Sequence, residues 1–331
     1  MKHPRRLTAL FLLLTLSSVC FAQELTWYPF DRDFINARYS TSAIGDLSVR
    51  VSHPAGNVHS SSCGGNDAEL HIGMTLPEIN LPNGQMPLSD SPGGDDDDWG
   101  VVAELPNTSS GNGKSQLAKL AGQPVKFFGY FRVWDEGHGQ GAVHPSNPHH
   151  VFEVHPAWGF SGTAANGNVV NFMRKDLVRP MESYSGFGAT KFKPLFESLT
   201  DEEWPMAFRA GGKLHLGLLR FSNFFQLPVR IKSIATVSGG HEVKVDVFSN
   251  QAMTNKVFSN LTTITVTGTP IDGTLSVGQK VFLLGFFSVN LKKALDASEG
   301  ATTEDNAVAV PEAVEFFVFG QAVNPAVSSC S

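Results

Sequence analysis

Hydrophobic and polar residues alternate with a period of two along much of the chain, which is the pattern of half-buried β-strands. The alternation is clearest over residues 242–247 and 262–267. In the first half it predicts strands at Ala43–Ser52, Glu69–Thr75, Gly100–Glu104, Pro124–Asp135 and His150–Pro156. In the second half it predicts strands at Leu227–Val237, Glu242–Ser249, Leu261–Thr269, Lys280–Asn290 and Ala313–Gly320. The chain is therefore expected to form two β-rich halves.

One phrase occurs in both halves. Residues 122–133 and residues 278–289 both follow the pattern G-Q-x-V-x-x-x-G-x-F-x-V, which is typical of a turn that leads into a long strand with a glycine kink. The fifth predicted strands also match, because residues 151–154 align with residues 313–316. These matches predict two copies of one β unit.

Five strands with a short helix before the fourth are typical of a small Greek-key barrel of the OB type. Residues 115–120 are the candidate helix in the first copy. The predicted fold is mostly β, with two tandem five-stranded OB-like barrels at residues 23–170 and 213–331. A mixed connector at residues 171–212 joins them. Its short helix is expected to begin at the capping box of Thr200–Glu203 and to end at Gly211–Gly212.

The N-terminal 22 residues have a basic start, an apolar run and small residues near the end, which predicts a cleaved secretory signal. A lipoprotein alternative would modify Cys20, but the usual leucine three positions earlier is missing. No later apolar run approaches the ~20 residues of a membrane-spanning helix. The mature chain is expected to be exported, to a periplasm or outside the cell.

Removal of the signal leaves 22 Lys and Arg against 31 Asp and Glu, a net charge of −9. Nucleic-acid binding requires an excess of positive charge, so a nucleic-acid partner is not expected. The mature cysteines are Cys63 and Cys330. In an oxidising compartment this pair is a candidate disulfide that would tie the C-terminus to an early loop.

The hairpin after the first copy of the phrase is rich in histidine. Residues 134–156 include His138, His144, His149, His150 and His155, together with Asp135, Glu136 and Glu153. Here the sequence resembles poorly characterised bacterial secreted OB-like β-barrel domains that share G-x-x-V-x-x-x-G, D-x-x-H and E-x-H-P, found in this chain at residues 122–129, 135–138 and 153–156. The resemblance covers about 35 residues, and Phe152 stands where many relatives have tryptophan. It implies the barrel fold but no assigned activity.

Strand geometry predicts which side chains share a face, since successive residues point to opposite sides. If Asp135 pairs with His150, Arg132 lies opposite Glu153 and Tyr130 opposite His155. Both pairs are expected on the outer face, with Arg132 and Glu153 as a cross-strand ion pair. This face is the candidate ligand surface, formed by Tyr130, Arg132, Trp134, His155 and Trp158.

Imidazole and carboxylate groups suit zinc, so Asp135, His138 and His155 are the candidate ligands of a divalent metal ion. The register separates Asp135 from His155 by roughly 17 Å, so the loop between the strands would have to fold back.

The second copy of the phrase provides an internal comparison. In the same register Asp135 becomes Leu291, His138 becomes Ala294 and His155 becomes Phe317. Two explanations remain open. Either ligand chemistry is confined to the first copy, or its outer face is simply solvated, whereas Phe282, Leu284, Phe286 and Phe317 of the second copy pack against another part of the protein.

The preferred function is a secreted or periplasmic non-catalytic binding or structural protein, whose first hairpin would bind an unidentified small molecule, glycan or peptide. The alternative is a zinc-type, metal-dependent hydrolase that uses the His, Asp and Glu cluster of residues 135–155. The non-catalytic function is preferred because no nucleophile, acid–base pair or metal motif has a specific spacing.

Overall fold

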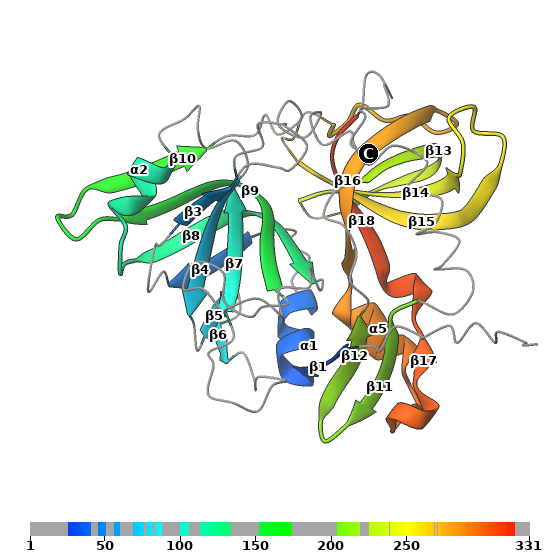
Figure 1. Cartoon of the computed structure of the whole chain (residues 1–331), viewed down its shortest axis with the longest axis horizontal. Helices are drawn as coiled ribbons and strands as arrows, with labels where there is room; N and C mark the ends of the chain where they lie inside the picture. The colour runs from blue at the N-terminus through cyan, green and yellow to red at the C-terminus, as the bar shows by residue number, and fades with distance from the viewer. Residues whose placement is uncertain are drawn as a thin grey trace, which may run out of the picture.

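Three β-sheets make up the described part of the chain, as Figure 1 shows. The computed structural model describes residues 26–40, 46–50, 56–59, 69–75, 78–81, 84–87, 100–105, 113–133, 152–173, 204–218, 225–237, 239–267, 269 and 271–321. Within these residues, no helix has the length and apolar character needed to cross a membrane.

The second half of the chain forms a closed five-stranded barrel. Its strands are β13 (Phe225–Val237), β14 (Gly240–Phe248), β15 (Lys256–Val266), β16 (Lys280–Val289) and β18 (Val314–Gln321). The order around the barrel is β13-β14-β15-β18-β16, and β15 pairs with β18 in parallel. The alternation that predicted β14 has a direct cause, because Val243, Val245 and Val247 are buried in the barrel core. All five strands predicted for this half are present.

The first half forms a nine-stranded sheet. Its strands are β2 (Asp46–Arg50), β3 (Gly56–His59), β4 (Glu69–Thr75), β5 (Glu78–Leu81), β6 (Gly84–Pro87), β7 (Gly100–Leu105), β8 (Pro124–Val133), β9 (Phe152–Thr163) and β10 (Val169–Met173). They follow the order β3-β4-β7-β9-β8-β2-β5-β6, and β10 pairs with β9. The second closed barrel expected here is not shown, since the described pairings extend the sheet beyond β2 to β5 and β6. Helix α2 (Gly113–Ala118) precedes β8, close to the predicted position.

The repeated phrase occupies the same strand position in both halves. Arg132 of β8 pairs with Glu153 of β9, and Ser288 of β16 pairs with Glu315 of β18. A register shift follows at Gly129 in one copy and at Gly285 in the other. The partner strands, β9 and β18, each have a parallel neighbour as well. Strand β9 pairs in parallel with β7, and β18 pairs in parallel with β15.

A third, four-stranded sheet was not predicted. It has the order β1-β12-β11-β17, with β1 (Thr26–Asp31), β12 (Lys213–Leu218), β11 (Met206–Ala210) and β17 (Val308–Ala309). The prediction that a helix ends at Gly211–Gly212 is wrong. Both glycines have positive φ and form the hairpin turn between β11 and β12. Residue 213, the predicted start of the second barrel unit, lies in β12, which pairs with β1 and β11 in this sheet, and the first strand of the closed barrel, β13, begins at Phe225.

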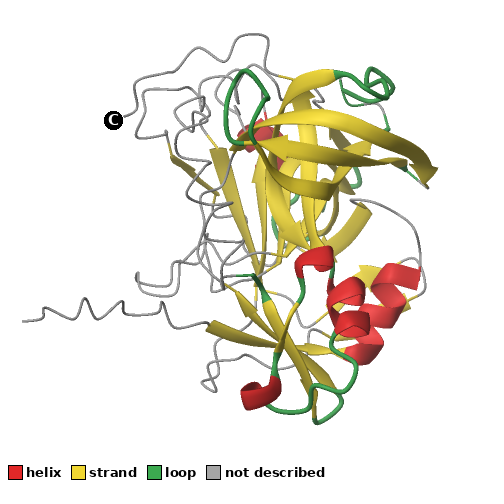
Figure 2. Ribbon diagram, turned by 90° about the vertical axis from the view of Figure 1, so that its right-hand side faces the viewer, coloured by secondary structure: helices red, strands yellow, loops and turns green. Residues whose placement is uncertain are grey.

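Two helices lie side by side against the buried face of this third sheet (Figure 2). They are α1 (Arg32–Ser40) and α5 (Leu291–Ala297), and the short turns η3 (Glu304–Asn306) and η4 (Pro311–Ala313) follow α5. Phe34 and Ile35 of α1 and Leu291 and Leu295 of α5 are buried in the same core as Leu214, Leu216 and Leu218 of β12. Helix α5 therefore belongs both to the barrel connection and to the third sheet.

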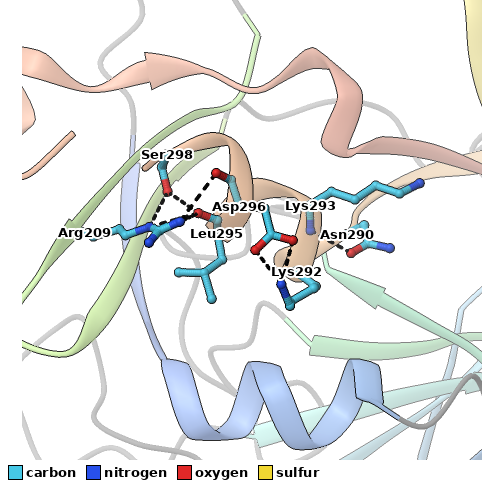
Figure 3. Close-up of polar contacts among 7 residues, drawn as sticks. All are labelled: Arg209, Asn290, Lys292, Lys293, Leu295, Asp296 and Ser298. Atoms are coloured by element: carbon cyan, nitrogen blue, oxygen red, sulfur yellow. Dashed lines mark hydrogen bonds and ion pairs between the residues drawn. The ribbon is translucent and has the colours of Figure 1, made fainter. Parts of the chain in front are cut away.

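Helix α5 is capped at both ends, as Figure 3 shows. At its N-terminus the side-chain oxygen of Asn290 accepts a hydrogen bond from the amide of Lys293 at 3.1 Å. At its C-terminus Nε of Arg209 donates to the carbonyl oxygen of Leu295 at 2.9 Å. A cation at this end also interacts favourably with the helix dipole. Because Arg209 lies in β11, this cap joins the third sheet to the barrel.

Candidate functional site

The outer faces of the two copies of the phrase pack against each other, at the contact between β8 and β16. An aromatic cluster lies at this contact and is called the joint below. Its buried members are Tyr130 and Trp158 from the first half and Ile264, Val266, Leu284, Phe286 and Phe317 from the barrel. The joint therefore covers the face that was expected to bind a ligand.

Aromatic rings at the joint meet in two matching contacts. The ring of Tyr130 stacks on Phe317 with a centroid distance of 4.7 Å and an interplanar angle of 18°. The ring of His155 lies 5.4 Å from that of Phe286. Since Phe286 is the counterpart of Tyr130 and Phe317 is the counterpart of His155, each contact repeats the other with the two halves exchanged. Tyr130 and Phe286 also meet directly, edge to face, at 5.6 Å.

An ion pair between Arg132 and Glu153 lies inside the joint. Nη1 of Arg132 is 2.9 Å from Oε2 of Glu153, as the register predicted. The expected exposure of this pair is wrong, because both side chains have a relative exposure of 0%. The barrel causes this burial: Nε of Arg132 donates to the carbonyl oxygen of Phe287 at 3.0 Å, and the guanidinium lies 5.1 Å from the Phe286 ring centroid.

Two further hydrogen bonds cross from the first half to the barrel. The amide of Val133 donates to Oγ of Ser288 at 2.9 Å, and the hydroxyl of Tyr130 donates to the carbonyl oxygen of Val318. Burial raises the pKa of Tyr130 far above its ordinary value, because a phenolate would lose its hydration there. Tyr130 is therefore a neutral hydrogen-bond donor.

The sequence-predicted site residues fall into two groups. Tyr130, Arg132, His155 and Trp158 come together at the joint and are buried, so they are not the solvent-exposed surface that was expected. Trp134, Asp135 and His138 lie outside the described residues, as do Cys63 and Cys330. The metal set and the disulfide therefore stay predictions. In the described ranges, no three His, Cys, Asp or Glu side chains gather to hold a metal ion.

The comparison between the copies had left two explanations open. The packing of Leu284, Phe286 and Phe317 against the first half is confirmed. A solvated outer face is not found at Arg132, Glu153 and His155, since these three polar side chains are fully buried. Buried polar groups on one copy and apolar groups on the other are therefore the two sides of one contact.

A pocket of about 400 Å³ lies on the barrel, away from the joint. It is called the barrel pocket, and its walls include Trp204, Phe258, Ser259, Asn260, Thr262 and Glu312. Sequence reasoning missed it because the strand was predicted to start at Leu261, whereas β15 starts at Lys256. The adjacent Ser259 and Asn260 form the bulge beside the pocket, but in a strand that also contains Thr262, Thr263 and Thr265 they are not a distinctive signal.

No protein-family profile, curated protein or solved structure matches this chain.

Proposed function

We propose that this chain is an exported, non-catalytic binding or structural protein whose two β units are held together by the joint. The observation that supports it best is the position of Arg132. Its guanidinium pairs with Glu153 in its own half and donates to Phe287 in the other, with no exposed surface. This polar residue, whose counterpart in the barrel is Ser288, therefore acts in packing.

The position of His155 supports the same function. Its side chain is 0% exposed, and its Nδ1 lies 3.5 Å from Oε2 of Glu153. A metal ion that activates water needs an open coordination position and access for substrate, in addition to its imidazole ligands. His155 instead occupies the place that Phe317 takes in the barrel copy, which favours packing over chemistry.

Export is part of this proposal and rests on the pattern of residues 1–22. The first unit is proposed to be an OB-like barrel of the same type as the second. Strands β2 and β3 pair with β8 and β4 in the way that the two ends of β13 pair with β16 and β14. Backbone NOEs that connect β2 to β3 as one strand would support this fold, and a wide separation of the two strands would contradict it.

Metal analysis of the purified mature protein tests the proposed function against the hydrolase alternative. We expect His155→Phe to fold with little loss of stability and with no change in metal content, since the other copy already has phenylalanine at this position. Tyr130→Phe is the matched control, because it makes the same kind of change one strand away. Near-stoichiometric zinc in the native protein, lost in His155→Phe and in His138→Ala but kept in Tyr130→Phe, would show that the proposal is wrong.

A further inference from the structure

The barrel pocket lies beside the part of β15 that precedes its parallel pairing with β18. This pairing begins at Thr262. The pocket is lined by residues of β15, by Trp204, by Pro311 and Glu312 of η4, and by Val314 of β18. Its volume of about 400 Å³ is within the usual range of small-molecule sites, roughly 300–1,000 Å³. This pocket shares no residue with the joint.

One side of the barrel pocket is aromatic. The rings of Trp204 and Phe258 lie 5.2 Å apart at an interplanar angle of 45°. Both side chains are half-buried and pack on the hydrophobic core, and this packing fixes their positions. A pair of fixed, partly exposed rings provides an apolar platform without a deep apolar cavity.

The other side is polar and carries mixed hydrogen-bonding groups. Ser259 and Asn260 are exposed, and Glu312 adds an exposed carboxylate. Two lysines orient this wall: Nζ of Lys232 donates to Oδ1 of Asn260 at 2.6 Å, and Nζ of Lys244 donates to Oγ1 of Thr262 at 2.6 Å. Hydroxyl, amide and carboxylate groups together can both donate to and accept from a ligand rich in hydroxyls.

The backbone of this wall is irregular. Val245 pairs with Leu261 and Val247 pairs with Phe258, so Ser259 and Asn260 lie in a bulge opposite Asp246. Asn260 has a φ of 64°, in the left-handed region that asparagine tolerates better than most residues. Bulges are common beside binding sites, and they make a strand a poor template for an added peptide strand. The bulge therefore favours a small molecule over an extended peptide.

We propose that the barrel pocket binds a neutral saccharide of one or two rings. The apolar face of a sugar ring would stack on Trp204 and Phe258, and its hydroxyls would bond to Asn260, Ser259 and Glu312. The carboxylate of Glu312 and the ammonium groups of Lys232 and Lys244 place both signs of charge around the pocket, so no strong field of one sign selects a charged sugar over a neutral one. This inference rests on the proposed binding function and gives it a ligand class and a location.

The test is titration of the full mature chain with cellobiose and with N,N′-diacetylchitobiose, followed by calorimetry and by tryptophan fluorescence. We expect saturable binding to at least one of the two sugars. Asn260→Gly, which keeps the left-handed backbone and removes the amide, and Phe258→Leu should each weaken the affinity about ten-fold. Glu312→Gln should weaken it less, about three-fold.

Matched variants separate the pocket from other sites. Phe282→Leu on β16, which is not paired with β15, and Glu299→Gln after α5 should bind sugar with unchanged affinity. Sugar binding that all three pocket variants leave intact would place the site elsewhere and overturn this inference, while the binding function would stand. Absence of binding to both sugars, or binding of an extended peptide of alternating valine and threonine in their place, would also overturn it. Hydrolysis of the bound sugar would overturn the non-catalytic function and leave the site.

Discussion

Asp246 is a buried carboxylate in the wall of the barrel. One of its oxygens is 2.6 Å from Nη2 of Arg230, and the other is 3.7 Å from Nζ of Lys232. Burial alone would raise the pKa of Asp246, but the hydrogen bond from Arg230 and the charges of Lys232 and Lys256 outweigh it. The pKa of Asp246 therefore lies below its ordinary value in the folded protein.

This shift predicts an acid-dependent loss of stability. Because the folded pKa is lower than the unfolded pKa of about 3.9, the contribution of Asp246 is present above that value and is lost as the pH falls through the folded pKa. Asp246→Asn should therefore be less stable than the native protein at pH 7, and the difference should shrink between pH 4 and pH 2. Urea unfolding at several pH values measures it.

The exposed Asp305 supplies the control for this prediction. Asp305→Asn should unfold like the native protein at every pH. An equal stability difference for Asp246→Asn at pH 7 and pH 2 would mean that the ionised carboxylate contributes nothing beyond its shape.

Strands β16 and β18 explain why the repeated phrase contains a glycine. A Cβ atom on Gly285 would meet the carbonyl oxygen of Phe317 well inside contact distance and would lie 2.8 Å from Cε1 of Phe316. The register shift at this glycine brings the two backbones together, and Gly129 lies at the corresponding shift in the first half. In the barrel copy the glycine of the phrase thus permits a close approach of two strands.

Gly285→Ala should lower the free energy of unfolding by about 1–3 kcal/mol, because the new methyl group forces β16 and β18 apart. Gly273→Ala is a useful comparison, since its φ is 70° but nothing lies within 4 Å of the added carbon. That variant should cost only the strain of a left-handed residue, about 1 kcal/mol. Thermal and chemical unfolding of both variants measure the difference. A loss for Gly285→Ala no greater than that for Gly273→Ala would contradict the close approach.

Alternation and the repeated phrase were sufficient to predict the barrel strands and the pairing of Arg132 with Glu153. They failed at Gly211–Gly212, where two adjacent glycines are equally compatible with a helix end and with a tight hairpin. The distant partners β1 and β17 decide that residues 206–218 form strands of a sheet. Helix α5 was missed for a similar reason, since seven residues are stabilised by caps and by the third sheet more than by their own propensity.

The sequence predicted which residues of the candidate site lie side by side, but it did not predict that they are buried. Strand geometry placed Tyr130, Arg132 and His155 on one face, and the structure brings them together. A local pattern cannot show what covers a face, so the ion pair was expected in water. The barrel pocket depends on a bulge and on the approach of η4, neither of which has a local sequence signature.

The whole molecule joins two related units through equivalent surfaces. Tyr130 meets its counterpart Phe286, and each of the two rings also contacts a ring on the fifth strand of the other half, stacked for Tyr130 on Phe317 and tilted for Phe286 on His155. Symmetric dimers have interfaces of this kind, in which one patch contacts its own copy. Here the symmetry is broken by polar groups of the first half, most of all by Arg132, which donates to a carbonyl oxygen of the barrel and has Ser288 as its counterpart.

Arg132→Ala should therefore weaken the entire joint. Removal of one partner leaves Glu153 buried beside the barrel, and such changes destabilise proteins by about 3–5 kcal/mol. We expect a lower melting temperature and, in small-angle scattering, a larger radius of gyration as the halves separate.

The double variant Arg132→Met with Glu153→Leu tests the cause. It removes both charges and keeps apolar volume at the joint, so most of the lost stability should return. If the double variant is as unstable as Arg132→Ala, the charge left on Glu153 is not the reason for the loss. If Arg132→Ala is as stable as the native protein, the joint does not depend on the pair.

The third sheet has a consequence for the order in which the chain can fold. Strand β1 pairs with β12, so Thr26 can pair only after Leu218 has been synthesised, about 190 positions later. The short β17 joins the same sheet only when residues 308–309 arrive. During synthesis, β1 therefore stays without its partner strand until residues 213–218 have been made, so a segment that is made early adds to the native sheet only late.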